Sequence, residues 1–91
     1  MPFYRFRIHG TGNLRNGMEG FYTTRWCWAP DQESAAAKAI RIVRKDAESQ
    51  HLGTISSLEV EEGWRISVFE ISKAPNRGYT LYGPGDENED P

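Results

Sequence analysis

Cys27 is the side chain in this sequence best suited to nucleophilic chemistry, and it lies between two tryptophans in FYTTRWCWAP, residues 21–30. A catalytic thiol needs a neighbouring base, usually a histidine, and a lowered pKa. His9 could supply that base if the two segments pair as strands with both side chains on one face. Because a lone cysteine in a strand usually serves as a small packing residue, we expect no catalytic role. An enzyme built on Cys27 and His9 is therefore a minor hypothesis.

The sequence lacks the spacings that metal and nucleotide sites use. His9 and His51 are the two histidines, and neither lies in an HxxxH, HExxH or CxxC pattern. The glycine-rich stretch GTGNLRNG, residues 10–17, contains G-x-G but not the G-x-G-x-x-G of dinucleotide-binding loops. A P-loop motif is also missing. We expect no catalytic residue, no metal and no cofactor.

The acidic stretch EVEE, residues 59–62, brings several carboxylates together on one short segment. A general acid–base pair needs a pocket that shifts the pKa values of its two groups. An exposed strand seldom provides such a pocket. We expect Glu59 or Glu61 to pair instead with Arg65, Arg7 or Arg25 across neighbouring strands.

Length and composition indicate one globular domain of 91 residues that is rich in aromatic side chains. A single cysteine permits no intrachain disulfide, which fits a reducing compartment. No apolar run is long enough for a transmembrane helix, and the start MPFYRFRIHG lacks the apolar core of a signal peptide. We therefore expect a cytoplasmic protein without a membrane partner.

The pattern along the chain predicts the element order β-β-α-β-β. Strands are indicated over residues 3–9 and 21–29 by alternation and by aromatic and β-branched side chains, and two more within residues 56–72. Asp31 is a helix N-cap before residues 32–49, which contain no Gly or Pro, and Gly53 is expected to end this helical region. The predicted fold class is α+β: about four strands in a mainly antiparallel sheet, with one helix packed on one face. A parallel crossover between the second and third strands stays open as an alternative.

The domain is expected to span residues 1–74, followed by a turn-rich segment, residues 75–91. This segment ends in DENEDP, which holds four of the thirteen acidic groups, so we expect a disordered acidic end. Residues 1–85 then carry eleven basic and nine acidic groups.

The expected helix presents a shallow apolar stripe, namely Ala36, Ala39, Ile40, Val43 and Ala47. Large side chains on the facing sheet should fill the space above it, because protein interiors are close-packed. In the second strand, Tyr22, Trp26 and Trp28 share one parity, and we expect them to face the helix with Trp26 buried. Phe6, Ile8, Leu58, Val60, Ile66 and Val68 are expected on the same face.

The opposite, open face is then expected to combine apolar and basic side chains. The predicted interaction face consists of Phe3, Arg5, Arg7, Phe21, Arg25, Arg65, Phe69 and Ile71. An apolar patch of this kind needs a cover. The cover is expected to be the segment around residues 79–82, a second copy of the chain, or another partner.

The leading functional hypothesis is a non-catalytic interaction protein that uses this open face and forms a homodimer or binds another protein. The alternative is single-stranded nucleic-acid binding, because arginines and aromatic side chains alternate on the first two strands. The low pI of about 5.6 weighs against this alternative, since nucleic-acid binders usually carry a strong basic patch.

Overall fold

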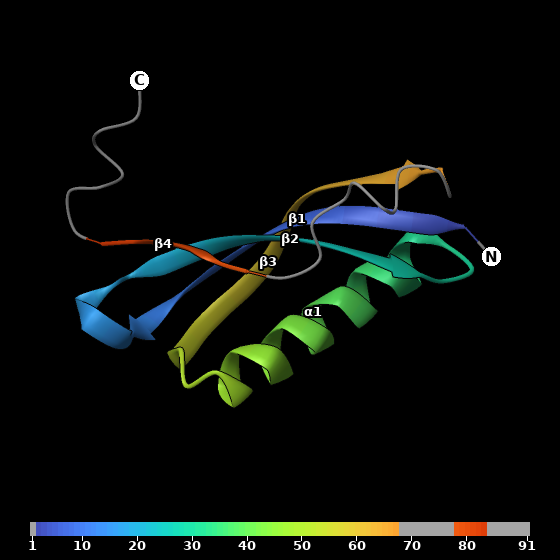
Figure 1. The fold of residues 1–91 in the computed structure, drawn as a ribbon. Coiled ribbons are helices and arrows are strands. Elements are labelled where there is room, and N and C mark those ends of the chain that lie inside the picture. The colour runs from blue at the N-terminus through green and yellow to red at the C-terminus, as the bar shows by residue number, and fades with distance from the viewer. Residues whose placement is uncertain (1, 68–77, 84–91) are drawn as a thin grey trace, which may run out of the picture.

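The computed structural model describes residues 2–67 and 78–83. The elements are β1 (Phe3–Leu14), a 3-10 turn (Arg15–Gly17), β2 (Gly20–Trp28), α1 (Gln32–Ser49), β3 (Gly53–Ile66) and β4 (Thr80–Tyr82). The strands form one sheet in the order β3-β1-β2-β4, with antiparallel pairing throughout. Helix α1 lies along one face of this sheet (Figure 1). The α+β prediction is therefore confirmed. Because β2 and β3 both run antiparallel to β1, they are parallel to each other, and α1 connects them across β1 as in the crossover that was kept as an alternative.

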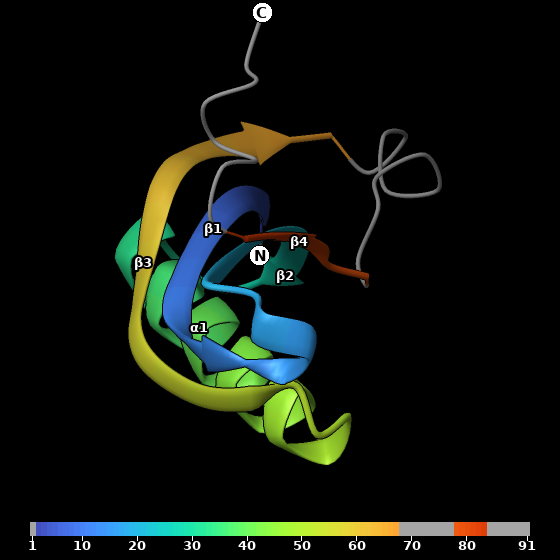
Figure 2. The same ribbon diagram turned by 90° about the vertical axis from the view of Figure 1, so that its left-hand side faces the viewer.

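The bounds of the third and fourth strands differ from the prediction. A turn was expected near Gly63, but β3 continues through it to Ile66, and the fourth strand is Thr80–Tyr82. The register between β1 and β3 shifts between Arg7 and Ile8 and again between Thr11 and Gly12. Such bulges bend a strand, and β3 arches strongly along its length (Figure 2). The expected domain boundary at residue 74 lies outside the described residues.

The two ends of α1 show how the helix is positioned. Asp31 accepts a hydrogen bond from the backbone N–H of Ser34 at 2.7 Å, which confirms the predicted N-cap. At the other end, His51 adopts a left-handed conformation with φ of 53°. The His51 N–H donates to Glu48 O and the Leu52 N–H donates to Ala47 O. This is a Schellman motif, so His51 rather than Gly53 ends the helix.

The core forms where α1 meets the alternate residues of β1 and β2. Phe6 pairs with Arg25 and Tyr4 with Cys27, so these residues share one face of the sheet. The helix contributes an alanine-rich stripe that matches the prediction in part. Ala39, Val43 and Ala47 are buried as expected, Ala35 is buried although it was not predicted, and Ala36 and Ile40 are only partly buried. Phe6 and Phe21 are fully buried between the two layers. None of the helices in the described part of the chain has the length and apolar character needed to cross a bilayer.

The prediction of which face of β2 meets the helix was wrong. Phe21, Thr23, Arg25 and Cys27 are buried there, whereas Trp28 is 50% exposed on the other face. Alanine side chains let α1 approach the sheet closely, and the rings of Phe6 and Phe21 already fill the intervening layer. No room is left there for indoles. Ile66 was also expected on the helix face, but it pairs with Phe3 and so belongs to the open face.

Phe21 and Trp28 therefore provide a direct test of the assignment of the two faces. Replacing Phe21 by Ala removes a fully buried ring and should lower the free energy of unfolding by about 3–5 kcal/mol. Trp28→Ala changes a half-exposed side chain and should cost about 1 kcal/mol or less. Urea denaturation of both variants checks the prediction, and a larger loss for Trp28→Ala than for Phe21→Ala would contradict it.

Candidate functional site

The open face of the sheet carries most of the aromatic side chains that do not contribute to the core. The register pairs Phe3 with Trp28, Arg5 with Trp26, Arg7 with Thr24 and His9 with Tyr22. Arg5 also pairs with Trp64 of β3, and Tyr82 of β4 contacts the His9 ring. We call this set the ring face, which consists of Phe3, Arg5, Arg7, His9, Tyr22, Trp26, Trp28, Trp64 and Tyr82.

Aromatic side chains contact one another at one end of the ring face. Phe3 stacks on Trp28 with ring centroids 5.7 Å apart, and its ring meets Trp26 edge-on at the same separation. Trp28 and Trp64 remain 50% and 38% exposed. All three tryptophans of the chain thus lie on one face, and two of them present large apolar surface to solvent.

The two arginines of the ring face lie over aromatic rings. The Arg5 guanidinium is 5.4 Å from the Trp64 ring centroid, and that of Arg7 is 4.8 Å from the Tyr22 ring centroid. Arg7 Nε also lies 3.5 Å from Glu61 Oε1, so the expected pairing of Glu61 with Arg7 is confirmed. Cation–π contacts favour these positions of the two guanidinium groups over the rings.

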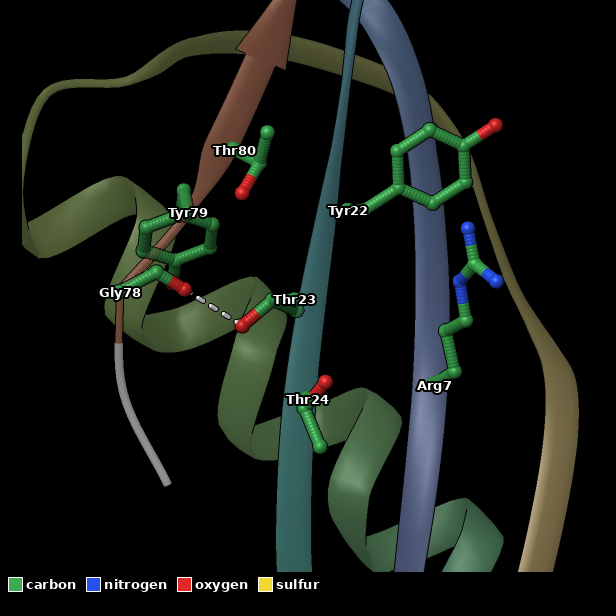
Figure 3. A pocket seen from close by; sticks show the side chains of 7 residues that line it. All are labelled: Arg7, Tyr22, Thr23, Thr24, Gly78, Tyr79 and Thr80. Atoms are coloured by element: carbon green, nitrogen blue, oxygen red, sulfur yellow. Dashed lines mark hydrogen bonds between the residues drawn. The ribbon is translucent and has the colours of Figure 1, made fainter. Parts of the chain in front are cut away.

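A cleft opens at the edge of β2, where the pairing with β4 stops at Tyr22. Its volume is about 320 Å³, and it lies between Thr23 and Thr24 of β2 and the segment Gly78–Thr80. Figure 3 shows Tyr22 and Arg7 on one side of β2 and Tyr79 and Thr80 on the other. The Thr23 hydroxyl donates to Gly78 O at 2.7 Å and closes one end. The lining is rich in hydroxyl groups and adjoins the ring face.

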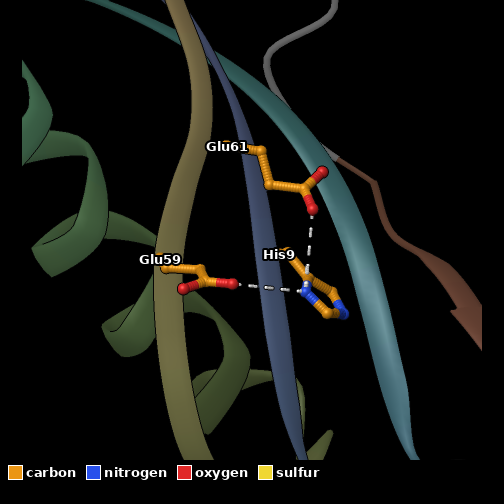
Figure 4. Close-up of side chains that lie close together, drawn as sticks. All are labelled: His9, Glu59 and Glu61. Atoms are coloured by element: carbon orange, nitrogen blue, oxygen red, sulfur yellow. Dashed lines mark ion pairs between the residues drawn. The ribbon is translucent and has the colours of Figure 1, made fainter.

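His9 stands at the centre of a polar cluster on the ring face (Figure 4). Its ring stacks on Tyr22 at 4.7 Å, and its Nε2 lies 2.6 Å from the Tyr82 hydroxyl. The other nitrogen, Nδ1, faces Glu59 Oε1 at 3.8 Å and Glu61 Oε2 at 3.9 Å. These three side chains come from paired strands about fifty positions apart, so no short sequence motif could have indicated the cluster.

The structure brings only part of the predicted interaction face together. Phe3, Arg5 and Arg7 lie on the ring face as expected. Phe21 and Arg25 do not, because both are buried against α1. Arg65 pairs with Tyr4, on the helix side of the sheet. Phe69 and Ile71 lie outside the described residues.

Sequence reasoning also missed the contributions of Trp64 and Tyr82. The bulge in β3 places Glu62 opposite Arg7 but Val60 opposite Ile8, so alternation changes parity at Glu61. Trp64 therefore points to the ring face while Gly63 lies under Phe6. A period-two pattern read straight through the segment could not reveal this change.

Arg25 belongs to a partly buried polar network rather than to the interaction face. Its Nη2 lies 3.3 Å from Asp46 Oδ2 on α1, and its guanidinium is 5.1 Å from the Tyr79 ring centroid. The Tyr79 hydroxyl donates to the same carboxylate oxygen at 2.6 Å. The network joins β2, α1 and the residue before β4. Burial, and then the hydrogen bond to Asp46, raise the pKa of Tyr79 to about 12.

Cys27 does not meet the conditions for a reactive thiol. It is buried on the helix face and donates a hydrogen bond to Ala35 O at 3.2 Å. Burial raises the pKa of the thiol, and the nearby Lys38 ammonium offsets part of this effect. His9 lies on the opposite face of the sheet, so the hypothetical Cys27–His9 pair is not formed.

The raised pKa of Tyr79 predicts how stability depends on alkaline pH. The folded chain holds this phenolic proton more tightly than the unfolded chain, whose tyrosines titrate near pH 10. The stability that this difference in the pKa of Tyr79 gives the folded chain is fully present below about pH 10. It is lost as the pH rises towards about 12. Urea denaturation across this range should give a steeper decline for the native chain than for Tyr79→Phe. Equal slopes would contradict the prediction, and Tyr22→Phe on the ring face is the matched control.

Known proteins provide no relative with which this chain can be compared. No protein-family model, no curated protein and no solved structure matches the chain. A function must therefore be argued from the ring face and the groups that adjoin it.

Proposed function

We propose that this chain is a non-catalytic interaction protein whose ring face binds another macromolecule, with a second copy of the same chain as the leading partner. The observation that carries the proposal is the exposure of Trp28 and Trp64, at 50% and 38%, beside Phe3 and two arginines. Tryptophan, tyrosine and arginine are the residues that contribute most to the binding energy of protein interfaces. Large aromatic side chains grouped at a surface are typical of a binding site.

The arrangement of charge favours a second copy as the partner. Arg5 and Arg7 form a basic row on β1, and Glu59, Glu61 and Glu62 form an acidic row on the adjacent β3. In a dimer with two-fold symmetry, the same surface meets itself. A second copy rotated by 180° about the two-fold axis would place its basic row opposite the acidic row of the first copy. Such complementarity guides association and fixes the register of the two surfaces.

A non-catalytic role in the cytoplasm is consistent with the state of the cysteine. Cys27 is buried and its raised pKa keeps the thiol protonated, which suits packing rather than nucleophilic chemistry. A chain with one cysteine forms no internal disulfide, so a reducing compartment costs it no stability. We therefore propose a cytoplasmic location.

Analytical ultracentrifugation tests self-association. The native chain should show a mass that rises from monomer to dimer with concentration, with a blue shift in tryptophan emission, because all three indoles lie on the ring face. Trp64→Ser should weaken the dimer at least tenfold, because it removes an exposed indole from the interface. Ile42→Ser, which removes a side chain 43% exposed on α1, is the matched control and should leave the dimer unchanged.

Two results would contradict self-association through this face. One is a monomeric mass for the native chain throughout the concentration range. The other is an equal loss of the dimer in Ile42→Ser and Trp64→Ser. Far-ultraviolet circular dichroism of each variant verifies that the fold is intact.

Single-stranded nucleic acid is the second candidate partner, favoured by one observation. Arg5 and Arg7 alternate with aromatic rings across neighbouring strands, as on surfaces that stack bases and bind phosphates. The acidic row of β3 and the net charge of −2 weigh against it, because phosphate binding depends on positive charge.

A fluorescence titration with an oligothymidylate at low salt separates the two candidates. If the ring face binds single strands, the oligonucleotide should quench tryptophan emission, and the affinity should fall steeply with added salt. Arg7→Glu should then abolish the quenching, whereas Arg41→Glu on the exposed side of α1 should not. Unchanged emission at low salt would exclude nucleic acid and leave the protein partner.

A further inference from the structure

His9 is held in one orientation by contacts on three sides. Its ring lies against both Tyr22 and Tyr82, with centroid separations of 4.7 Å and 5.8 Å, and the two tyrosine rings are themselves 5.7 Å apart. Its Nε2 forms a 2.6 Å hydrogen bond with the Tyr82 hydroxyl, and its side chain is only 18% exposed. The imidazole therefore has little rotational freedom, and its second nitrogen, Nδ1, points to β3.

Two carboxylates converge on this nitrogen. Glu59 Oε1 and Glu61 Oε2 lie 3.8 Å and 3.9 Å from Nδ1, and Figure 4 shows both side chains directed from β3 towards the ring. These distances are too long for N–H···O hydrogen bonds, which span about 2.7–3.2 Å. They exceed by about half an ångström the roughly 3.4 Å between two ligands of a tetrahedral ion whose bonds are about 2.0–2.2 Å long, so a small inward movement of the two glutamate side chains would complete the geometry. The three ligand atoms all lie within 4.8 Å of one another.

The sheet itself builds this arrangement. His9 pairs with Glu59 in the register between β1 and β3. The bulge opposite Arg7 and Ile8 leaves Glu61 without a register partner on β1, and its side chain points to the same face. The ligands thus come from paired strands of a rigid sheet rather than from loops, which favours a preformed site.

The groups around the three ligands suit a metal ion. When Nε2 carries the imidazole proton and donates it to Tyr82, Nδ1 presents a lone pair, as in metal sites where an outer hydrogen bond orients the histidine. Arg7 does not compete for the same atom, because its Nε approaches Oε1 of Glu61 while Oε2 faces His9. One positive ion would also relieve the repulsion between the two carboxylates.

We propose that His9, Glu59 and Glu61 bind a divalent transition-metal ion of the zinc type, through Nδ1 and one oxygen of each carboxylate. The imidazole nitrogen favours such an ion over magnesium or calcium, which prefer oxygen ligands throughout. Three protein ligands leave a fourth position for water or for a donor from a bound partner. One chain supplies all three ligands, so zinc binding requires no second copy, although Glu59 and Glu61 also belong to the acidic row of the proposed dimer surface.

Calorimetric titration of the metal-free protein with ZnCl₂ tests the proposal, and Co²⁺ serves as a spectroscopic probe. We expect one ion per chain and visible cobalt absorption typical of mixed nitrogen and oxygen ligands. His9→Gln, Glu59→Gln and Glu61→Gln should each weaken zinc binding at least tenfold. Tyr82→Phe keeps the stacked ring but removes the hydroxyl, and should weaken binding about tenfold, as loss of an outer partner usually does.

Two matched controls distinguish this site from adventitious binding. His51→Gln removes the other histidine, and Glu62→Gln removes the neighbouring carboxylate of β3. Neither change should alter zinc affinity. The proposal is overturned if the native chain binds no zinc, or if either control weakens binding as much as His9→Gln.

The ¹⁵N chemical shifts of the histidine rings give a second readout that depends on no substitution. Addition of zinc should move the His9 Nδ1 resonance to the range of metal-bound nitrogen and leave His51 unchanged. A shift confined to His51 would overturn the proposal.

Discussion

The pairing of β1 with a neighbour on each side is the constraint on which the rest of the structure depends. β1 is joined to β2 and β3 along most of its length, so its register fixes which side chains of both neighbours share a face. Phe6 and Ile8 are fully buried on one side, and Arg7 and His9 project on the other. A slip of one position would exchange the core and the ring face together.

The fold could be predicted from the sequence where the local signals agreed. Alternation along the first strand, the Asp31 cap and the alanine stripe of the helix each indicated the observed element. The orientation of β2 could not be derived, because both of its parities contain large side chains. The observed orientation of β2 depends on the close approach of α1 to the sheet, which favours the small side chains of Thr23 and Cys27 over indoles.

Only part of the candidate site could be predicted from the sequence. The reason differs from the one that applies to the orientation of β2. Phe3, Arg5 and Arg7 lie on the face away from α1 as expected, because β1 alternates without ambiguity. Trp64 and Glu61 depend on a bulge, which depends on pairing between strands far apart in sequence. Tyr82 reaches His9 only because β4 pairs with the far side of β2. Local periodicity contains no information about such contacts.

The close approach of Phe21 to Gly10 has a consequence for how this chain can vary. A Cβ atom at position 10 would lie 2.3 Å from the Phe21 ring, although the two residues belong to different strands. A side chain at position 10 therefore requires a smaller residue at position 21, and the two positions should change together during evolution. In diverged copies of this chain, an aromatic ring at position 21 is expected only where position 10 remains glycine. Such a correlated pair would identify the pairing of β1 with β2 from sequences alone.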